Sequence, residues 1–270
     1  MKIAVTGAAG LFGYGLVKVF EGGHAVYPLT RTEADITRRE AVDVVFTKIK
    51  PQVVIHAAAI PDLDLCEADP AKAFGVNVHG TRHVVDAARR VGARVATIST
   101  DAVFDGLKHS PYGELDTPRP PTVYGRTKLL AERITLEGGG SWVFRVSVLF
   151  GPGKTNFVEK GLRKIAEGGE YVVAADQIGS AAYTLDLAQK MREVIEAERY
   201  GLYHLANTGS CSRLELAQRA AEIAGLDLSK ITGKPSAEMG RPAKRLHYAV
   251  MEMGALKQQG FAPPRPWAEA

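Results

Sequence analysis

The chain has 270 residues, of which 46% are hydrophobic and 24% charged, so it can bury a large core and is expected to be globular, neither disordered nor fibrous. No stretch reaches the roughly 18 unbroken apolar residues of a membrane span, and no basic leader with an apolar segment opens the chain. The formal charge of +4 is spread among acids without a long basic run, which does not support nucleic-acid binding. We therefore expect a cytoplasmic protein with no membrane or nucleic-acid partner.

Two cysteines, Cys66 and Cys211, are too few for a disulfide scaffold. Neither stands at zinc-ligand spacing from another cysteine or a histidine, so we take both as ordinary thiols. The acidic residues form no cluster that demands a cation. We therefore expect no metal.

Short β-branched runs alternate with amphipathic stretches through the first two thirds of the chain, a pattern typical of a parallel sheet covered by helices on both faces. Strands are predicted at 2–6, 24–29, 53–57, 94–99, 142–148 and 202–206. Helices are predicted near 11–21, 38–48, 71–91, 122–137 and 184–198. Beyond about residue 150 the pattern loosens, which predicts a smaller, mostly helical lobe that 184–206 interrupts by returning to the sheet.

A glycine-rich turn, GAAGLFG at 7–13, joins the first predicted strand to the first helix. Gly7 can adopt the positive φ of a tight turn, Gly10 lets the backbone approach a pyrophosphate, and Gly13 allows close packing of helix on strand. Leu11 and Phe12 open the helix, whose free N–H groups face the anion. A plain turn between strand and helix is the alternative, but this context favours dinucleotide binding.

The end of the second predicted strand bears on the choice between NAD and NADP. Arg31 stands where an NAD-selective site usually places an acid for the ribose 2′-OH, and no acid is there. Arg31 can meet a 2′-phosphate, which favours NADPH, although a solvated surface arginine is the alternative. Asp35 and Ile36 can reach the adenine end of the cofactor, and a helix cap is the alternative for Asp35.

Tyr124 and Lys128 lie four residues apart in a predicted helix, so their side chains share one face and can address one ligand. A free tyrosine has a pKa of about 10. A nearby ammonium and a cationic nicotinamide both favour the phenolate, so we expect Tyr124 to exchange protons near neutrality. Thr100 directly follows the strand predicted at 94–99, and its hydroxyl can form a hydrogen bond with the substrate oxygen. A simple turn cap is the alternative role for Thr100.

These residues resemble the extended short-chain dehydrogenase/reductases, and within them the dTDP-4-dehydrorhamnose reductase branch. Besides the glycine turn and the Tyr124/Lys128 pair, the resemblance covers nearly the whole chain through the runs VIHAAA (54–59), NVHGT (77–81), STDAVFDG (99–106), PYGE (111–114), RVS (145–147), NF (156–157), DQIG (176–179) and RP (241–242). It implies an α/β fold with a Rossmann-type doubly wound parallel sheet and a smaller, mostly helical C-terminal substrate lobe. We expect a dinucleotide-binding domain at 1–150, rejoined by 184–206, and a substrate-binding lobe at 151–183 and 207–270.

The resemblance implies that Thr100, Tyr124 and Lys128 form a catalytic triad. It implies cofactor contacts from Gly7, Gly10, Leu11, Phe12, Gly13, Arg31, Asp35, Ile36, Ala57, Ala58, Ala59, Tyr124 and Lys128. It implies substrate contacts from Ala102, Val103, Phe104, Val148, Asn156 and Arg241. Ala102 and Val148 stand where that branch typically has aromatic residues lining the sugar pocket, and the run at 180–184 lacks its usual Pro-Thr. We therefore expect a wider cavity, in which the dTDP-rhamnose precursor is usable but not preferred.

The sequence thus predicts an NAD(P)-dependent oxidoreductase acting on CH–OH groups. Its expected reaction is reduction of the keto group of a nucleotide-linked sugar, as in dTDP-L-rhamnose biosynthesis, with NADP or NAD as cofactor and NADPH favoured. By the resemblance, a homodimer is expected. One alternative is a sugar-nucleotide epimerase or dehydratase that retains NAD. Another is a non-catalytic nucleotide-binding regulatory subunit, against which the intact triad argues.

Overall fold

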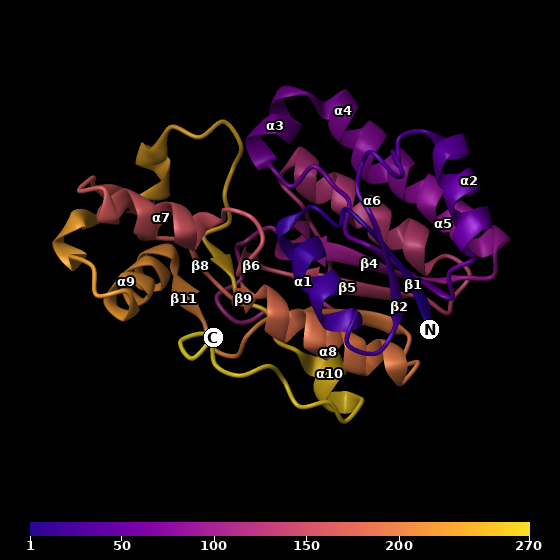
Figure 1. Cartoon of the computed structure of the whole chain (residues 1–270). Coiled ribbons are helices and arrows are strands. Elements are labelled where there is room, and N and C mark those ends of the chain that lie inside the picture. Colours follow the sequence, from indigo (N-terminus) through magenta and orange to yellow (C-terminus); the bar gives the residue numbers. More distant parts are fainter.

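The computed structural model describes residues 1–270, which form a larger and a smaller lobe (Figure 1). The larger lobe contains a parallel six-stranded sheet in the order β10-β5-β4-β3-β1-β2. The strands are β1 (Lys2–Thr6), β2 (Ala25–Leu29), β3 (Val53–His56), β4 (Arg94–Thr100), β5 (Trp142–Val146) and β10 (Gly201–Leu205). All six predicted strands are confirmed. The strand order reverses between β1 and β3, which is where open α/β sheets bind ligands.

Helices cover both faces of this sheet, so the predicted doubly wound fold is confirmed (Figure 1). On one face lie α1 (Leu11–Phe20) and α8 (Thr184–Glu196), and on the other lie α2 (Arg39–Ile49), α5 (Thr81–Arg90) and α6 (Val123–Leu136). Leu16 and Leu187 are fully buried on the first face, and Phe46 and Val84 on the second. Burying each such side chain stabilises the fold by about 1.5–3 kcal/mol.

Two predicted elements are divided in the structure. The strand predicted at 142–148 ends at Val146, and Val148–Phe150 forms a separate strand, β6, which pairs with β9 (Ala181–Tyr183). The helix predicted near 71–91 consists of α4 (Pro70–Phe74), a π-helical turn η1 (Gly75–Gly80) and α5. It follows α3 (Leu63–Ala68), which was not predicted. Because π-helical turns are often found at functional sites, the residues of η1 are of interest below.

The smaller lobe is built on α7 (Phe157–Ala166) and α9 (Arg213–Ile223), which pack together around the buried Ile165, Ala217 and Ala221. It also holds strands that the sequence pattern did not reveal, because each is only two to four residues long and shows no periodicity. These are β7 (Tyr171–Ala174) paired with β12 (Ile231–Lys234), and β8 (Ile178–Gly179) between β11 (Cys211–Ser212) and β13 (Tyr248–Ala249).

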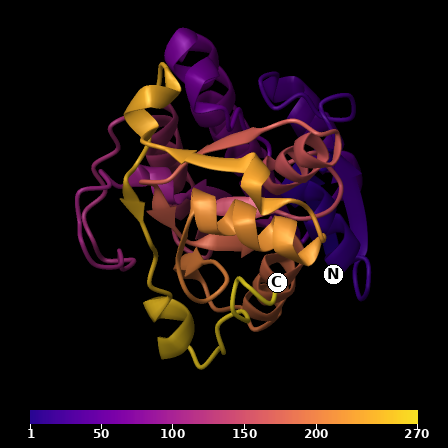
Figure 2. The same cartoon turned by 90° about the vertical axis from the view of Figure 1, so that its left-hand side faces the viewer.

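The C-terminal segment connects the lobes. Figure 2 shows α9 across the front of the smaller lobe and the yellow C-terminal segment returning towards it from α10 (Gly254–Gln258). Pro266 forms a bridge to Thr208, and Trp267 packs beside Val148. None of the helices is long and apolar enough to cross a membrane.

Candidate active site

The glycine turn after β1 forms a cradle that only glycine permits. Gly7 has a φ of +71°, and a Cβ on it would lie 2.6 Å from Ala58 N. A Cβ on Gly13 would lie 2.1 Å from Gly7 O, so α1 could not approach the strand with any larger residue there. Gly10 provides no side-chain cap, which leaves the first N–H groups of α1, beginning at Leu11, free for an anion. The cradle therefore fits a dinucleotide pyrophosphate, with 57–59 as its second wall.

A buried neutral histidine holds the ends of β1 and β3 beneath this cradle. The Thr81 hydroxyl donates to Asn77 O at 2.7 Å, so His56 Nε2–H donates to Thr81 Oγ1 at 3.0 Å and His56 Nδ1 accepts from the Thr6 hydroxyl at 2.7 Å. Burial lowers the pKa of His56 to about 3, and the charge of Lys128 acts in the same direction. His56 therefore acts as an uncharged support.

An acid that sequence reasoning missed lies at the end of β2. The chain turns back after Thr30, with Ala34 N donating to Thr30 O at 3.0 Å, and the Glu33 carboxylate accepts from Thr30 N at 2.8 Å. No acid stands at 30–32 itself, but the turn returns Glu33 to the end of the strand. The signal was an acid 20 residues after Gly13, the spacing of the ribose-binding acid in dinucleotide sites.

The predicted adenine-side residues lie on the same turn. The Arg31 side chain is 85% exposed, and its Nε lies 3.4 Å from Asp35 Oδ2. Asp35 accepts from Thr37 N at 3.0 Å, but the residue that caps α2 is Arg38, so the helix-cap alternative for Asp35 is wrong. Ile36 is buried against Gly80. Arg31 thus has most of its surface available for a ligand.

The three residues predicted to be catalytic come together at the carboxyl end of β4. Thr122 caps α6 by accepting from Gly125 N at 3.1 Å. A Cβ on Gly125 would lie 2.2 Å from Ala102 O, so glycine at this position lets α6 approach the turn after β4. This close contact brings Tyr124 near Thr100, whose side chain is close enough to influence the pKa of the phenol.

The phenol of Tyr124 is a buried proton donor. The residue is 9% exposed, and burial raises the pKa of Tyr124 above its ordinary value, while the neighbouring Thr100 side chain lowers it and the charge of Asp101 raises it. The expected pKa near neutrality is therefore not found in the chain alone, because withdrawal from water outweighs the other effects. Tyr124 is protonated at neutral pH and can give a proton to a ligand oxygen.

Lys128 lies one turn further along α6 and is 4% exposed. Burial lowers the pKa of Lys128 to about 8, and the charge of Glu132, a further turn along, opposes this shift. Glu132 is fixed by Arg145, whose Nε and Nη2 donate to it at 2.8 and 2.7 Å, and by the Ser99 hydroxyl. A line of proton donor, ammonium and fixed carboxylate therefore runs along one face of α6.

Asn77 in the π-helical turn is a second residue whose role sequence reasoning missed. Its Oδ1 accepts from Ile60 N at 2.8 Å, and its Nδ2 donates to Ile60 O at 3.1 Å and to Thr127 Oγ1 at 3.0 Å. These bonds tie the loop after β3 to α6 beside Lys128. The sequence signal was the amide side chain of Asn77 within the amphipathic helix predicted near 71–91. In the structure this amide is buried, and a buried amide needs hydrogen-bond partners of this kind.

The predicted substrate residues next to the triad are largely enclosed. Ala102 packs with Cys66, Val123 and Tyr124. Val103 and Phe104 are fully buried, so their side chains have no surface left for a substrate, and only their backbone groups can contact one.

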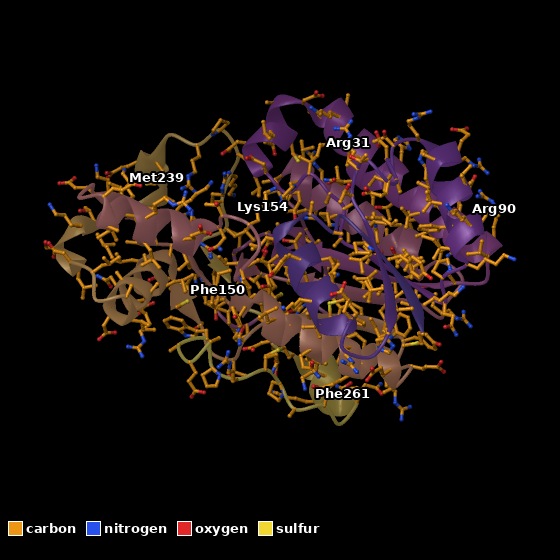
Figure 3. The ribbon with its side chains drawn as sticks, in the orientation of Figure 1. Arg31, Arg90, Phe150, Lys154, Met239 and Phe261 are labelled. Carbon is orange, nitrogen blue, oxygen red and sulfur yellow. The ribbon has the colours of Figure 1, made fainter.

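The remaining predicted substrate residues belong to the smaller lobe. Val148 packs against Ala181 and Leu216. Asn156 caps α7, its Oδ1 accepting from Val158 N at 3.1 Å, and its Nδ2 donates to Gly151 O at 2.9 Å. The side chain of Asn156 thus already has partners within the chain. Figure 3 labels Lys154, on the same loop, where the two lobes meet.

Arg241 is exposed and stands at the start of a segment that spans the lobes. Asp64 on α3 binds Arg245, with Nη2 2.7 Å from Oδ2, and also accepts from Ala243 N at 2.9 Å. Figure 1 shows this gold segment next to α3. These contacts of Asp64 hold the smaller lobe against the larger one beside the site. No three histidine, cysteine, aspartate or glutamate side chains are grouped so as to hold a metal ion.

The pKa of Lys128 predicts an alkaline limit to activity. Since that pKa is about 8, the ammonium is present below this pH and is lost as the pH rises through it. We expect kcat/KM, which reports the free enzyme, to fall above about pH 8. Lys128→Met should lower both kcat and cofactor affinity and remove this limb. The measurement is a rate profile from pH 6 to 10 on both proteins, together with a cofactor titration. Unchanged cofactor affinity in the variant would contradict the assignment.

Comparison with known proteins shows similarity along the full length. The RmlD substrate binding domain family matches residues 1–270. The spore coat polysaccharide biosynthesis protein SpsK of Bacillus subtilis is 35% identical over 271 residues, covering 100% of this chain and 95% of that protein. A dTDP-4-dehydrorhamnose reductase of Streptomyces griseus is 36% identical over 274 residues, covering 98% and 90%. The crystal structure of a dTDP-4-dehydrorhamnose reductase from Bacillus anthracis in complex with NADP matches with a TM-score of 0.96 at 33% identity, covering 99% and 96%.

Proposed function

The chain belongs to the RmlD substrate binding domain family, and we propose on this basis and on the geometry of its site that it reduces the keto group of a nucleotide-linked sugar, in the manner of a dTDP-4-dehydrorhamnose reductase. It is an NAD(P)-dependent oxidoreductase. The observation that carries the proposal is the buried, protonated Tyr124 near Thr100, at the carboxyl edge of the sheet that also holds the glycine cradle.

These residues divide the reaction between them. Tyr124 gives its proton to the substrate oxygen, which Thr100 orients by hydrogen bonding. The ammonium of Lys128 stabilises the phenolate that Tyr124 leaves and binds the ribose of the cofactor. Bound NADPH or NADH supplies the hydride to the carbonyl carbon. Glu132 supports the charge of Lys128 without reaching the reacting atoms.

The proposal assigns the two lobes separate tasks. Residues 1–150 with 184–206 bind the dinucleotide, and 151–183 with 207–270 bind the substrate. The proposed substrate contacts are Ala102, Val148, Asn156 and Arg241, together with the backbone of 103–104. We also infer a cytoplasmic homodimer. Support for a reducing compartment comes from both cysteines, which are free, buried thiols whose pKa values burial raises to about 11.

The test is NADPH consumption across a panel of nucleotide-linked keto sugars, with small ketones as controls. We expect turnover of dTDP-linked 4-keto-6-deoxysugars. Turnover of small ketones alone, or of nothing in the panel, would overturn the nucleotide-sugar substrate. Denaturing the purified protein and identifying the released nucleotide separates the alternatives, because firmly held NAD indicates an epimerase or dehydratase and exchangeable NADPH a reductase.

The turn after β2 predicts a modest preference for NADPH that depends on Arg31. Its exposed guanidinium can bind a 2′-phosphate, while Glu33 on the same turn can accept from the 2′-OH of NADH. We expect Arg31→Ala to abolish the preference for NADPH and leave the use of NADH unchanged. The measurement is kcat/KM with each cofactor, and Arg90→Ala, a surface substitution on α5, is the control. Equal losses with both cofactors would make Arg31 a structural residue.

A further inference from the structure

Asp101 directly follows Thr100 and begins the 3-10 turn η2 (Asp101–Val103) after β4. Its Oδ1 accepts from the Thr100 hydroxyl at 2.9 Å, and its Oδ2 accepts from the hydroxyl of Ser147, which lies between β5 and β6. The carboxyl group is thus fixed between two neighbouring strand ends, one residue from a member of the triad. None of the reaction steps assigned to the triad uses it.

The hydroxyl of Thr100 has a single proton, and in this arrangement the proton points to Asp101. A hydroxyl donates one hydrogen bond and accepts up to two. Thr100 Oγ1 already accepts from Ala102 N at 3.1 Å, so one further bond to it can only come from another donor. A ketone oxygen has no proton to give. Thr100 therefore cannot orient a substrate carbonyl while an Asp101 carboxylate holds its proton.

A protonated Asp101 removes this conflict. A carboxylic acid has one O–H donor, and with the proton on Oδ1 it donates to Thr100 Oγ1, while Oδ2 still accepts from Ser147. The Thr100 hydroxyl is then free to donate to a carbonyl oxygen. The heavy atoms need not move, because the same two oxygens, 2.9 Å apart, form the bond in either direction.

The immediate partners of Asp101 also suit the neutral form. Glu132, the other acid behind the triad, keeps its charge through a bidentate bond with the Arg145 guanidinium. The two carboxyl oxygens of Asp101 instead meet hydroxyls, which bond equally well to a neutral acid. Burial raises the pKa of Asp101, and the two hydroxyl bonds oppose this rise without cancelling it.

Two titratable side chains from other elements act on Asp101 or respond to it. Arg213, the first residue of α9, favours the carboxylate through its charge. Tyr124 on α6 responds in the opposite sense, because the charge of Asp101 raises the pKa of the phenol. When Tyr124 gives its proton to the substrate, its phenolate would form near a second negative charge if Asp101 were ionised. A neutral Asp101 avoids this repulsion.

We propose that Asp101 is a positioning residue that takes up a proton when the ketone binds, donates it in a hydrogen bond to Thr100 and so makes Thr100 a donor to the carbonyl oxygen. This inference rests on the proposed function. The proton comes from water, stays on Asp101 during hydride transfer and returns to water when the alcohol leaves. The proton that ends on the product still comes from Tyr124. Ser147 occupies the second oxygen and keeps the acid proton on the side of Thr100.

The experiment compares Asp101→Asn with Asp101→Ala. An asparagine amide can donate to Thr100 and accept from Ser147, so D101N copies the neutral acid and not the carboxylate. We expect D101N to keep most of the wild-type kcat/KM in NADPH consumption. D101A should lose roughly ten- to a hundredfold, somewhat less than removal of a positioned donor outright. Asp105→Asn, the same change at an acid that accepts from Tyr112 in the loop after β4, is the matched control and should keep its activity.

Proton uptake is the readout that a merely structural role would not change. Calorimetry at pH 7, in buffers of different ionisation enthalpy, measures the protons taken up when a nucleotide-linked keto sugar binds to protein saturated with NADP⁺, which cannot turn over. We expect uptake approaching about one proton in the wild type and none in D101N. Since the ketone selects the protonated acid, kcat/KM of the wild type should also decline as the pH rises through the pKa of Asp101, and D101N should lack this decline.

Ser147→Ala gives a test in the opposite direction. The bond from Ser147 lowers the pKa of Asp101, so its loss should raise that pKa, move the decline of kcat/KM to higher pH and reduce the proton uptake at pH 7. D101N as impaired as D101A, or equal proton uptake in the wild type and D101N, would overturn the inference. Wild-type turnover of keto sugars with either result rejects only the role of Asp101. Ketone binding with proton uptake but without any turnover with NADPH rejects only the reductase function.

Discussion

Tyr124→Phe is expected to reduce kcat by about a hundredfold to ten-thousandfold, the range contributed by a positioned proton donor. The substitution removes the hydroxyl that gives the proton and keeps the ring that packs with Ala102 and Val123. Dinucleotide affinity should change little, because the cradle at 7–13 and Lys128 are untouched. The measurement is steady-state NADPH consumption together with a fluorescence titration of NADPH.

A matched control is Tyr112→Phe, which removes a phenol that donates to Asp105 in the loop after β4, outside the triad. We expect it to keep most of the activity. Activity at the wild-type level in the Tyr124 variant would reject the triad, whereas a loss of dinucleotide affinity of the same size as the loss of kcat would show that Tyr124 acts mainly in binding.

Glu132→Ala is expected to lower the free energy of unfolding by about 3–5 kcal/mol, because it leaves the Arg145 guanidinium buried without its partner. Both side chains are almost completely buried, and the bidentate contact is joined by the Ser99 hydroxyl. Urea unfolding followed by circular dichroism measures the change. Glu137→Ala, which breaks an exposed pair with Arg82, should have little effect, since water solvates both groups.

The double variant Glu132→Leu/Arg145→Met gives the sharper comparison. Replacing both charges with apolar side chains removes the stranded guanidinium, so stability should recover well above that of the single variant. The double variant should nevertheless have a Lys128 pKa below about 8, because the carboxylate that opposes the effect of burial is gone. The alkaline limb of kcat/KM should therefore move to lower pH. A single variant as stable as the wild type would contradict the buried ion pair.

Most elements of the larger lobe could be predicted because their periodicity is uninterrupted over several turns or strand residues. The glycine cradle was predictable for a different reason: Gly7 and Gly13 occupy positions where a Cβ would meet backbone atoms, so the residue type itself reports the contact. Tyr124 and Lys128 could be paired because helical geometry fixes how residues four apart are related. Each of these inferences depends on a short, local sequence pattern.

The features that the sequence analysis missed depend on contacts between distant segments. Glu33 acts at β2 through a turn whose path the sequence does not specify, and the π-helical turn around Asn77 has the same composition as an ordinary helix. The side chain of Phe104 is hidden because it stacks on Tyr112, with ring centroids 4.3 Å apart.

The position of β10 has a consequence for the order in which the chain can fold. This last strand of the large sheet comes from residues 201–205 and covers the edge of β5, all five of whose residues are buried. A nascent chain that has emerged only to residue 150 would carry β5 as an unpaired apolar edge, the kind of surface that recruits other chains. The nucleotide-binding half therefore cannot complete its own sheet during synthesis. It must wait until residues 201–205 have been made, and a fragment cut at residue 150 should aggregate.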